Sequence, residues 1–289
     1  MNGVKRNLGP LYSAPMAIWF TVFFLAPIAI IFLYSFLRRG LHGGVIWEFS
    51  LEAYRSLLNP NFIQITLRTI YTAIVSTILI IAIALPCGYY MARSKKQTLL
   101  LLLIIIPFWT NFLIRVVAWM NILGGRGIIN EILLRLGIIE FPLSFLFNHN
   151  AVMLVLVYMY LPYAILPLFS TIDKFDFSLL EAARDLGATQ PLAIFKILFP
   201  NIQGGLFTAI LFTFIPIFGN YAVPLLVGGN DYMLGNMIAD QLTRARNWPL
   251  ASSISVVITV ITTFGILIML YVQKKDAQVR AAEVKGATH

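Results

Sequence analysis

Charged residues are scarce in this sequence. Only 11% of its 289 residues are charged, whereas 59% are hydrophobic. Soluble domains carry roughly a quarter charged residues, so this shortage excludes an ordinary water-soluble fold. Several stretches run about twenty residues with almost no charge, which is the length that a helix needs to cross a bilayer. The composition therefore predicts an all-α polytopic membrane protein.

Sequence motifs for catalysis and for metal binding are missing. Cys87 is the only cysteine, which excludes an intrachain disulfide. The three histidines, His42, His149 and His289, are scattered and have no metal-ligand spacing, so we expect no metal site. No GxSxG nucleophile elbow occurs either. We therefore expect no catalytic residues and no enzyme activity in this chain.

The phosphate-binding loop GxxxxGK[ST] is absent as well. If ATP drives a process that involves this chain, a partner must bind the nucleotide, and we expect no cofactor on the chain itself. The net charge of +9 is typical of a membrane protein with cytoplasmic basic loops. Nucleic-acid binding is disfavoured, because no basic helix with interleaved aromatic residues is present.

Apolar stretches predict six transmembrane helices within a single domain over residues 1–289. The predicted spans cover about residues 16–37, 64–92, 98–119, 150–171, 206–228 and 252–272. The first run is too long for a cleavable signal peptide and has no small-x-small site before Arg38. An even number of spans puts both termini on one side of the membrane.

The distribution of lysine orients the spans. All eight lysines fall near the termini, in the turn at residues 93–96 or in the loop 172–200, which share one predicted face. The positive-inside rule assigns that face to the cytoplasm. We therefore expect both termini and the loop 172–200 in the cytoplasm.

Prolines and outer loops add detail to the spans. Seven prolines lie inside the spans or at their ends, which favours an enclosed pathway, although packing kinks are the alternative for each one. On the outer side, residues 47–60 predict a short amphipathic helix that ends at a proline. Residues 124–139 predict a glycine-rich break followed by a surface helix. Trp248 is expected to anchor the start of the last span at the interface.

The loop 172–200 is unusually charged and predicts two short helices. One helical face of SLLEAARDLG carries Leu179, Ala182, Ala183 and Leu186, and the other positions carry Glu181, Arg184 and Asp185. Gly187 suits a helix C-cap, and Pro191 can start a second helix, which Pro200 follows. A shallow alanine face admits close approach of another protein. A solvated helix on the membrane surface is the alternative, and the residues alone do not decide between them.

The same loop resembles the EAA loop of type I ABC importer permeases. That family's pattern is EAA, three residues, G, nine residues and I-x-[LF]-P, and it matches Glu181-Ala182-Ala183, Gly187 and Ile197-Leu198-Phe199-Pro200. The resemblance covers most of the chain. The stretches PFWTNFLIRVVAW (107–119) and GNMIADQLTRARNWPLASS (235–253) are similar to permeases of the spermidine/putrescine branch.

The resemblance implies a function and a set of partners. The loop would be a cytoplasmic coupling helix that contacts an ATP-binding subunit through Glu181, Ala182, Ala183, Arg184, Asp185, Gly187, Ile197 and Pro200. The expected assembly contains two ATP-binding subunits that hold ATP and Mg, a second homologous permease of different sequence, and a periplasmic or extracellular solute-binding protein. The expected location is the bacterial inner membrane, and the expected solute is a polyamine or a related cationic or opine-like compound.

Polar and aromatic residues within the spans are candidates for the translocation path, because such groups are costly in lipid unless they are paired or wet. The candidates are Trp109, Asn111, Tyr160, Tyr163, Asn220 and Tyr221, with Asp231 and Asp240 as acids at the outer entrance. Each tyrosine alone is equally compatible with packing. No Asp or Glu lies in any predicted span core, and Arg115 would repel a cation if it were unpaired. Acids that hold a polyamine would then come from the partner permease.

An ion-coupled secondary transporter or channel is the competing hypothesis. Such a protein would usually carry intramembrane acids and inverted repeats, and neither is seen in this sequence. A structural or assembly protein of the membrane is a third possibility, and it would give no solute flux.

Overall fold

The computed structural model describes residues 9–286 of the chain. Lys5, one of the lysines that orient the spans, lies outside this range, as does His289. The described residues form two compact units. One comprises the residues up to Ile63 with Met237–Ile261, and the other comprises Gln64–Asn236 with the residues from Thr262 onward.

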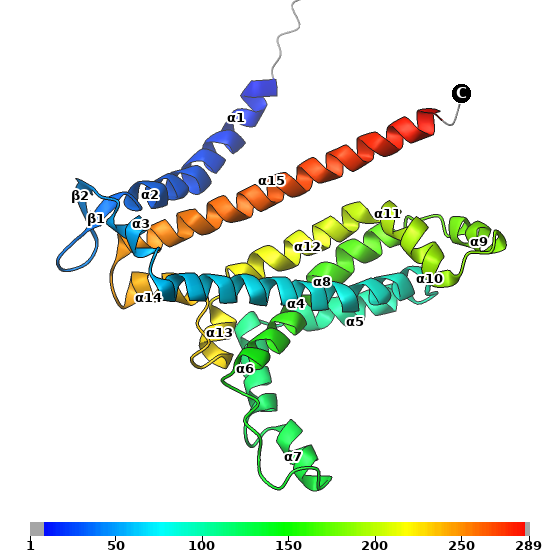
Figure 1. Ribbon diagram of the computed structural model, residues 1–289, viewed down its shortest axis with the longest axis horizontal. Coiled ribbons are helices and arrows are strands. Elements are labelled where there is room, and N and C mark those ends of the chain that lie inside the picture. The colour runs from blue at the N-terminus through cyan, green and yellow to red at the C-terminus, as the bar shows by residue number, and fades with distance from the viewer. Residues whose placement is uncertain (1–8, 287–289) are drawn as a thin grey trace, which may run out of the picture. The chain divides into compact units, whose positions relative to one another are not determined.

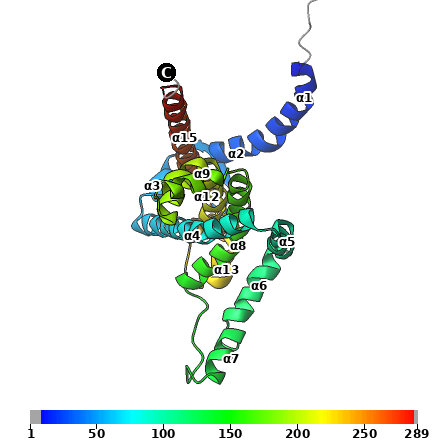
Figure 2. The same ribbon diagram turned by 90° about the vertical axis from the view of Figure 1, so that its right-hand side faces the viewer.

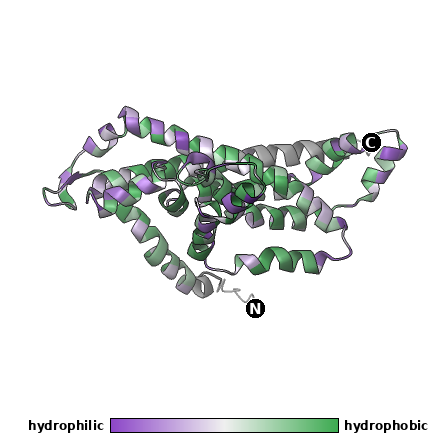
Figure 3. Ribbon diagram, turned by 90° about the horizontal axis from the view of Figure 1, so that it is seen from below, coloured by the Kyte–Doolittle hydropathy of each residue, from purple (hydrophilic) through white to green (hydrophobic). Residues whose placement is uncertain are grey.

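The first unit begins with one apolar helical run. It consists, without a break, of α1 (Gly9–Phe20), the π-helical turn η1 (Thr21–Leu25) and α2 (Ala26–Tyr34) (Figure 1). None of residues 14–34 is buried within the chain, and hydrophobic residues dominate the long helices (Figure 3). Such a surface needs lipid or a partner to cover it. The run matches the predicted first span, although the helix ends at Tyr34.

A β-hairpin follows this run and takes in the first residues of a predicted helix. β1 (Leu37–Arg39) pairs antiparallel with β2 (Val45–Phe49), and only α3 (Glu52–Ser56) is helical before α4 begins at Pro60. The predicted helix over residues 47–60 is therefore confirmed over Glu52–Ser56 and wrong for residues 47–49, which lie in β2. Its first residues extend along β1 instead, and the Ser50 N–H donates to the Phe36 carbonyl at 2.8 Å.

The last two helices are α14 (Leu234–Thr243) and α15 (Trp248–Gly286). α15 starts at Trp248, as the sequence predicted, and the Trp248 ring stacks on Tyr34 with 6.1 Å between ring centroids. The predicted last span lies inside α15. Within the first unit, this contact joins the start of the last span to the end of the first.

The second unit is built around α8 (His149–Ile172), ten of whose residues are buried. α12 (Gln203–Phe218) packs most extensively against it. Gly205 permits this approach, because a Cβ at that position would lie 2.2 Å from the Thr171 hydroxyl oxygen. Small residues at contact points are the usual means by which membrane helices pack closely.

α4 (Pro60–Arg93) runs beside α8 in the same direction. The Tyr71 ring stacks on His149 near the starts of the two helices, with centroids 5.9 Å apart. Near their ends, a Cβ at Gly88 would lie 3.2 Å from the backbone nitrogen of Phe169. The two helices therefore define two ends of this unit, and the segment that follows α8 lies at the end where α4 finishes (Figure 1).

Asparagine side chains divide two of the predicted spans. The span predicted at 98–119 is two helices, α5 (Gln97–Phe108) and α6 (Phe112–Leu123), and Asn111 caps α6 by accepting the Leu113 N–H at 2.8 Å. The span predicted at 206–228 is α12 followed by α13 (Ala222–Val227), where Asn220 accepts the Val223 N–H at 3.0 Å. The span predictions rest on runs of apolar residues, and such runs carry no information about a side-chain cap that ends one helix and starts another.

The remaining helices are short. α7 (Ile128–Arg135) confirms the predicted surface helix, and α9 (Ser178–Asp185), α10 (Gln190–Ala193), η2 (Ile194–Leu198) and α11 (Phe199–Asn201) form the loop after α8. α9 faces the viewer in Figure 2. Among the described residues, 5 helices are long and apolar enough to cross a membrane, or 6 if the helical pair bent by 76° before and after Ile202 is one span.

Candidate functional site

The charged loop begins with a well-defined helix. α9 starts after Asp176, whose carboxylate accepts the Ser178 N–H at 3.0 Å, and hydrogen bonds from Ser178 lower the pKa of Asp176. The helix ends at Gly187, which adopts a φ of 88°. The Gly187 N–H donates to the Arg184 carbonyl at 2.9 Å and the next N–H donates to the Ala183 carbonyl at 3.0 Å. The predicted glycine C-cap is confirmed.

The second helix is longer than the sequence predicted. It starts at Gln190 with Pro191 in its first turn, as predicted, and continues through the π-helical turn η2 into α11. Pro200 lies inside α11, so the prediction that this proline follows the helix is wrong. The whole segment Gln190–Asn201 then bends by 76° into α12. It therefore lies across the direction of the span that follows.

The predicted apolar face of α9 points away from the rest of the chain. Leu186 is 90% exposed, Leu179 is 46% exposed, and Ala182 is exposed. Ala183, the fourth residue of this face, is half-buried, and Leu180, which lies outside the predicted face, is buried with 7% exposure. An apolar side chain such as Leu186, set so far into solvent, is more suited to contact with another protein than to packing within this one.

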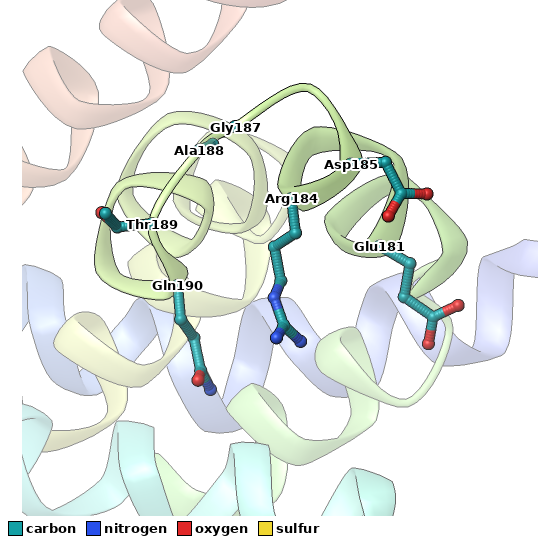
Figure 4. Close-up of a pocket in the computed structure, with 7 residues that line it drawn as sticks. All are labelled: Glu181, Arg184, Asp185, Gly187, Ala188, Thr189 and Gln190. Carbon is teal, nitrogen blue, oxygen red and sulfur yellow. The ribbon is translucent and has the colours of Figure 1, made fainter.

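An open hollow of about 740 Å³ lies between α9 and α10. Its lining consists of Glu181, Arg184, Asp185 and the connecting residues Gly187, Ala188, Thr189 and Gln190. In Figure 4 the side chains of Arg184 and Gln190 point the same way, and the two carboxylates lie on the side away from Thr189. Four of the predicted coupling residues thus share one hollow. Ile197 and Pro200 lie on the second helix, half-buried and outside it.

Three of the predicted path residues come together. The side-chain amide of Asn220 donates to the Tyr160 hydroxyl at 2.9 Å, and both residues are buried or nearly so. The Tyr160 and Tyr163 rings lie 5.7 Å apart, and the Phe108 ring meets Tyr163 edge-on at 4.9 Å. The guanidinium carbon of Arg115 lies 4.8 Å from the centroid of Phe108. These rings from α5 and α8 therefore form a continuous aromatic row, which ends at the guanidinium of Arg115.

The other predicted path residues lie elsewhere. Trp109 is 84% exposed and Tyr221 is 52% exposed. Asn111 is exposed, and its side chain caps α6. Asp240 forms a salt bridge to Arg244 at 3.5 Å within the same helix.

Asp231 is not an open acid at the entrance. Only 4% of its side chain is exposed, and its two oxygens lie 2.9 Å from a guanidinium nitrogen of Arg68 and 2.8 Å from Nδ1 of His149. This cluster sits where α4 and α8 start, at the end of the unit opposite α9. Sequence reasoning missed Arg68 and His149 as partners. The available signal was an arginine inside the predicted span 64–92, because a charge in a span needs a partner.

No group of three or more His, Cys, Asp or Glu side chains that could hold a metal ion occurs within the described part of the chain. The candidate site consists of the hollow between α9 and α10, which we name the docking hollow, and of the aromatic row formed by Phe108, Tyr163 and Tyr160.

Comparisons with known proteins show the family to which this chain belongs. Residues 80–276 match the family described as "Binding-protein-dependent transport system inner membrane component". The chain is 35% identical to the spermidine/putrescine transport system permease protein PotB of Escherichia coli over 256 residues, which are 88% of this chain and 92% of that protein. The PotB of Haemophilus influenzae is also 35% identical, over 92% of this chain and 94% of its own length.

Solved structures share the fold. A bacterial ABC transporter of alginate, in complex with a periplasmic protein bound to an alginate pentasaccharide, aligns with a TM-score of 0.74 at 16% identity, over 92% of this chain and 94% of that chain. The MetNI methionine ABC transporter aligns with a TM-score of 0.56 at 20% identity, over 78% of this chain and 98% of that chain. These likenesses extend the match from sequence to the helical architecture. The chain therefore belongs to the family of binding-protein-dependent transport system inner membrane components, and is a multi-pass inner-membrane permease of an ABC importer, not an enzyme.

Proposed function

We propose that this permease carries a polyamine such as spermidine or putrescine, or a related cationic or opine-like compound, into the cell. The support for the solute is the 35% identity to spermidine/putrescine permeases over about nine tenths of the chain. The ring of Tyr163, which is 40% exposed and lies beside Tyr160, supports the same class, because ring faces attract organic cations.

The observation that carries the coupling role is the exposed apolar face of α9 beside the charged hollow. Burying side chains such as Leu179 and Leu186 against a partner would contribute about 1.5–3 kcal/mol each, less the entropy of ordering them. The carboxylates of Glu181 and Asp185 and the guanidinium of Arg184 would then fix the register of the contact. A nucleotide-binding subunit is the partner that this arrangement serves, because this chain has no phosphate-binding loop of its own.

The proposed assembly has two permeases of different sequence, two ATP-binding subunits that hold ATP and Mg, and a periplasmic solute-binding protein. The whole chain acts as one transmembrane domain with both termini in the cytoplasm. Closure of the ATP-binding subunits draws the two coupling loops together, the spans open outward, and the solute enters from its binding protein. Hydrolysis returns the inward-facing state. Acids that hold a polycation come from the second permease.

The test is uptake of labelled spermidine by the complete importer in proteoliposomes. Glu181→Arg reverses a charge in the docking hollow and should reduce both uptake and binding-protein-stimulated ATP hydrolysis at least tenfold. Glu131→Arg, the same change on the exposed helix α7, is the matched control and should keep both. Unchanged uptake with Glu181→Arg would refute the coupling role. Uptake that follows an ion gradient without ATP would instead support the competing secondary transporter.

A further inference from the structure

We propose that Arg93 and Phe177 form a cation–π clamp that makes α4 follow the coupling helix α9 when the ATP-binding subunits move it. This inference rests on the proposed coupling function of the loop and names the residues that pass its movement to a second transmembrane helix. It assigns a positioning role to a pair that lies outside the coupling motif itself.

The clamp joins the last turn of α4 to the residue that precedes α9. The guanidinium carbon of Arg93 lies 5.4 Å from the centroid of the Phe177 ring and 5.9 Å from that of Tyr89. A guanidinium nitrogen of Arg93 also donates to the Tyr89 hydroxyl at 3.1 Å. The two rings meet edge-on with centroids 5.9 Å apart. The three side chains thus form a closed triangle, and a planar guanidinium suits contact with two rings.

A second contact crosses the same joint. The side-chain amide of Gln97, at the start of α5, donates to the Asp173 carboxylate at 2.9 Å and to the Ala92 carbonyl at 3.0 Å. The turn between α4 and α5 is therefore attached to the segment between α8 and α9 at two separate points.

Chain connectivity explains why α4 needs a clamp. α8 leads into α9 through a few residues, so a pull on α9 reaches α8 through covalent bonds. α4 has no such connection to α9, because the chain passes through α5, α6, α7 and α8 between them. Besides the packing of α4 along α8, side-chain contacts transmit the movement, and Arg93 with Phe177 supplies the one next to α9.

The clamp also adjoins the docking hollow. Tyr89, Arg93 and Phe177 line a small second hollow together with Glu181, Arg184 and Gln190, and those last three residues also line the docking hollow. A partner that displaces Glu181 or Arg184 therefore acts on side chains next to the clamp. Glu181, Arg184 and Gln190 therefore lie between the proposed partner and the contact of Arg93 with Phe177.

The first test measures coupling in the complete importer, as spermidine taken up per ATP hydrolysed. Arg93→Ala and Phe177→Ala should each lower this ratio about two- to fivefold, the effect of losing one partly exposed cation–π contact. Phe177→Tyr keeps the ring and should keep the ratio. The double variant should match the single variants, because both remove the same contact. An unchanged ratio in Phe177→Ala, or a double variant that multiplies the two losses, would overturn the proposal.

Matched controls separate the clamp from its surroundings. Lys95→Ala removes one positive charge from the same turn, and Tyr90→Ala removes a ring from α4 that is 66% exposed. Both should keep the wild-type ratio. A loss as large as that of Arg93→Ala in either control would count against the clamp.

The second test does not depend on the solute or on uptake. With Cys87 replaced by alanine, spin labels at Tyr90→Cys and Ser178→Cys report the distance between α4 and α9. This distance should be equal in the nucleotide-free and ATP-bound importer, and should change between the two states after Phe177→Ala. A distance that already changes in the protein with an intact clamp would overturn the proposal. Failure of the unmodified chain to bind ATP-binding subunits would instead refute the proposed function.

Discussion

Adding one methyl group at Gly205 should push α8 and α12 apart. A Cβ at this position would lie 2.2 Å from the hydroxyl oxygen of Thr171, 2.7 Å from its Cβ and 3.0 Å from the Pro167 carbonyl oxygen. The Thr171 hydroxyl could rotate away, but it already donates to the Pro167 carbonyl at 2.9 Å. The Thr171 Cβ is bonded to the backbone and the Pro167 oxygen is part of it, so neither can move without the helix. Gly205→Ala should therefore lower the free energy of unfolding by about 1–3 kcal/mol through overpacking.

Gly204 offers a matched control one residue away in the same helix. No atom lies within 4 Å of a Cβ built there, so Gly204→Ala should be neutral or should stabilise by up to about 1 kcal/mol through helix propensity. Reversible unfolding in mixed detergent micelles measures both variants. Thr171→Ala in the Gly205→Ala background should restore part of the loss, since it removes the nearest atom. Equal stability of the two glycine variants would refute this account of the helix contact.

Two further predictions follow from single residues. Gly187→Val should lower uptake because its φ of 88° costs a branched side chain about 1–2 kcal/mol, whereas Gly187→Asn, which tolerates this conformation, should keep most of the activity. Equal uptake by the two variants would contradict the strain argument. Asp231→Ala should lower the free energy of unfolding by about 2–4 kcal/mol, because it leaves Arg68 without its buried partner. Glu131→Ala removes an exposed pair and should cost about 0.5 kcal/mol, measured by the same unfolding assay; a similar loss in both would contradict the role of burial.

The apolar spans and the helix ends in the charged loop could be predicted from the sequence, because both depend on neighbouring residues. The spans follow from runs of apolar residues, because an unpaired backbone in lipid must become helical. The end of α9 at Gly187 and the start of the next helix near Pro191 depend only on a few neighbouring residues, and both were predicted. The coupling motif is likewise confined to residues 181–200, and four of the predicted coupling residues line one hollow in the structure.

Long-range contacts decided the rest. The predicted helix over residues 47–60 forms only over Glu52–Ser56, because residues 45–49 pair with β1. Asp231 became a buried ion-pair centre because Arg68 and His149, 163 and 82 positions away, meet it where α4 and α8 start. The link between Arg93 and Phe177 joins two helices that are distant in the sequence. The sequence by itself determined where helices form, since hydrophobicity and helix caps act over a few residues. Only the tertiary structure decided which charges are paired and which distant helices are in contact, because those depend on atoms brought close by folding.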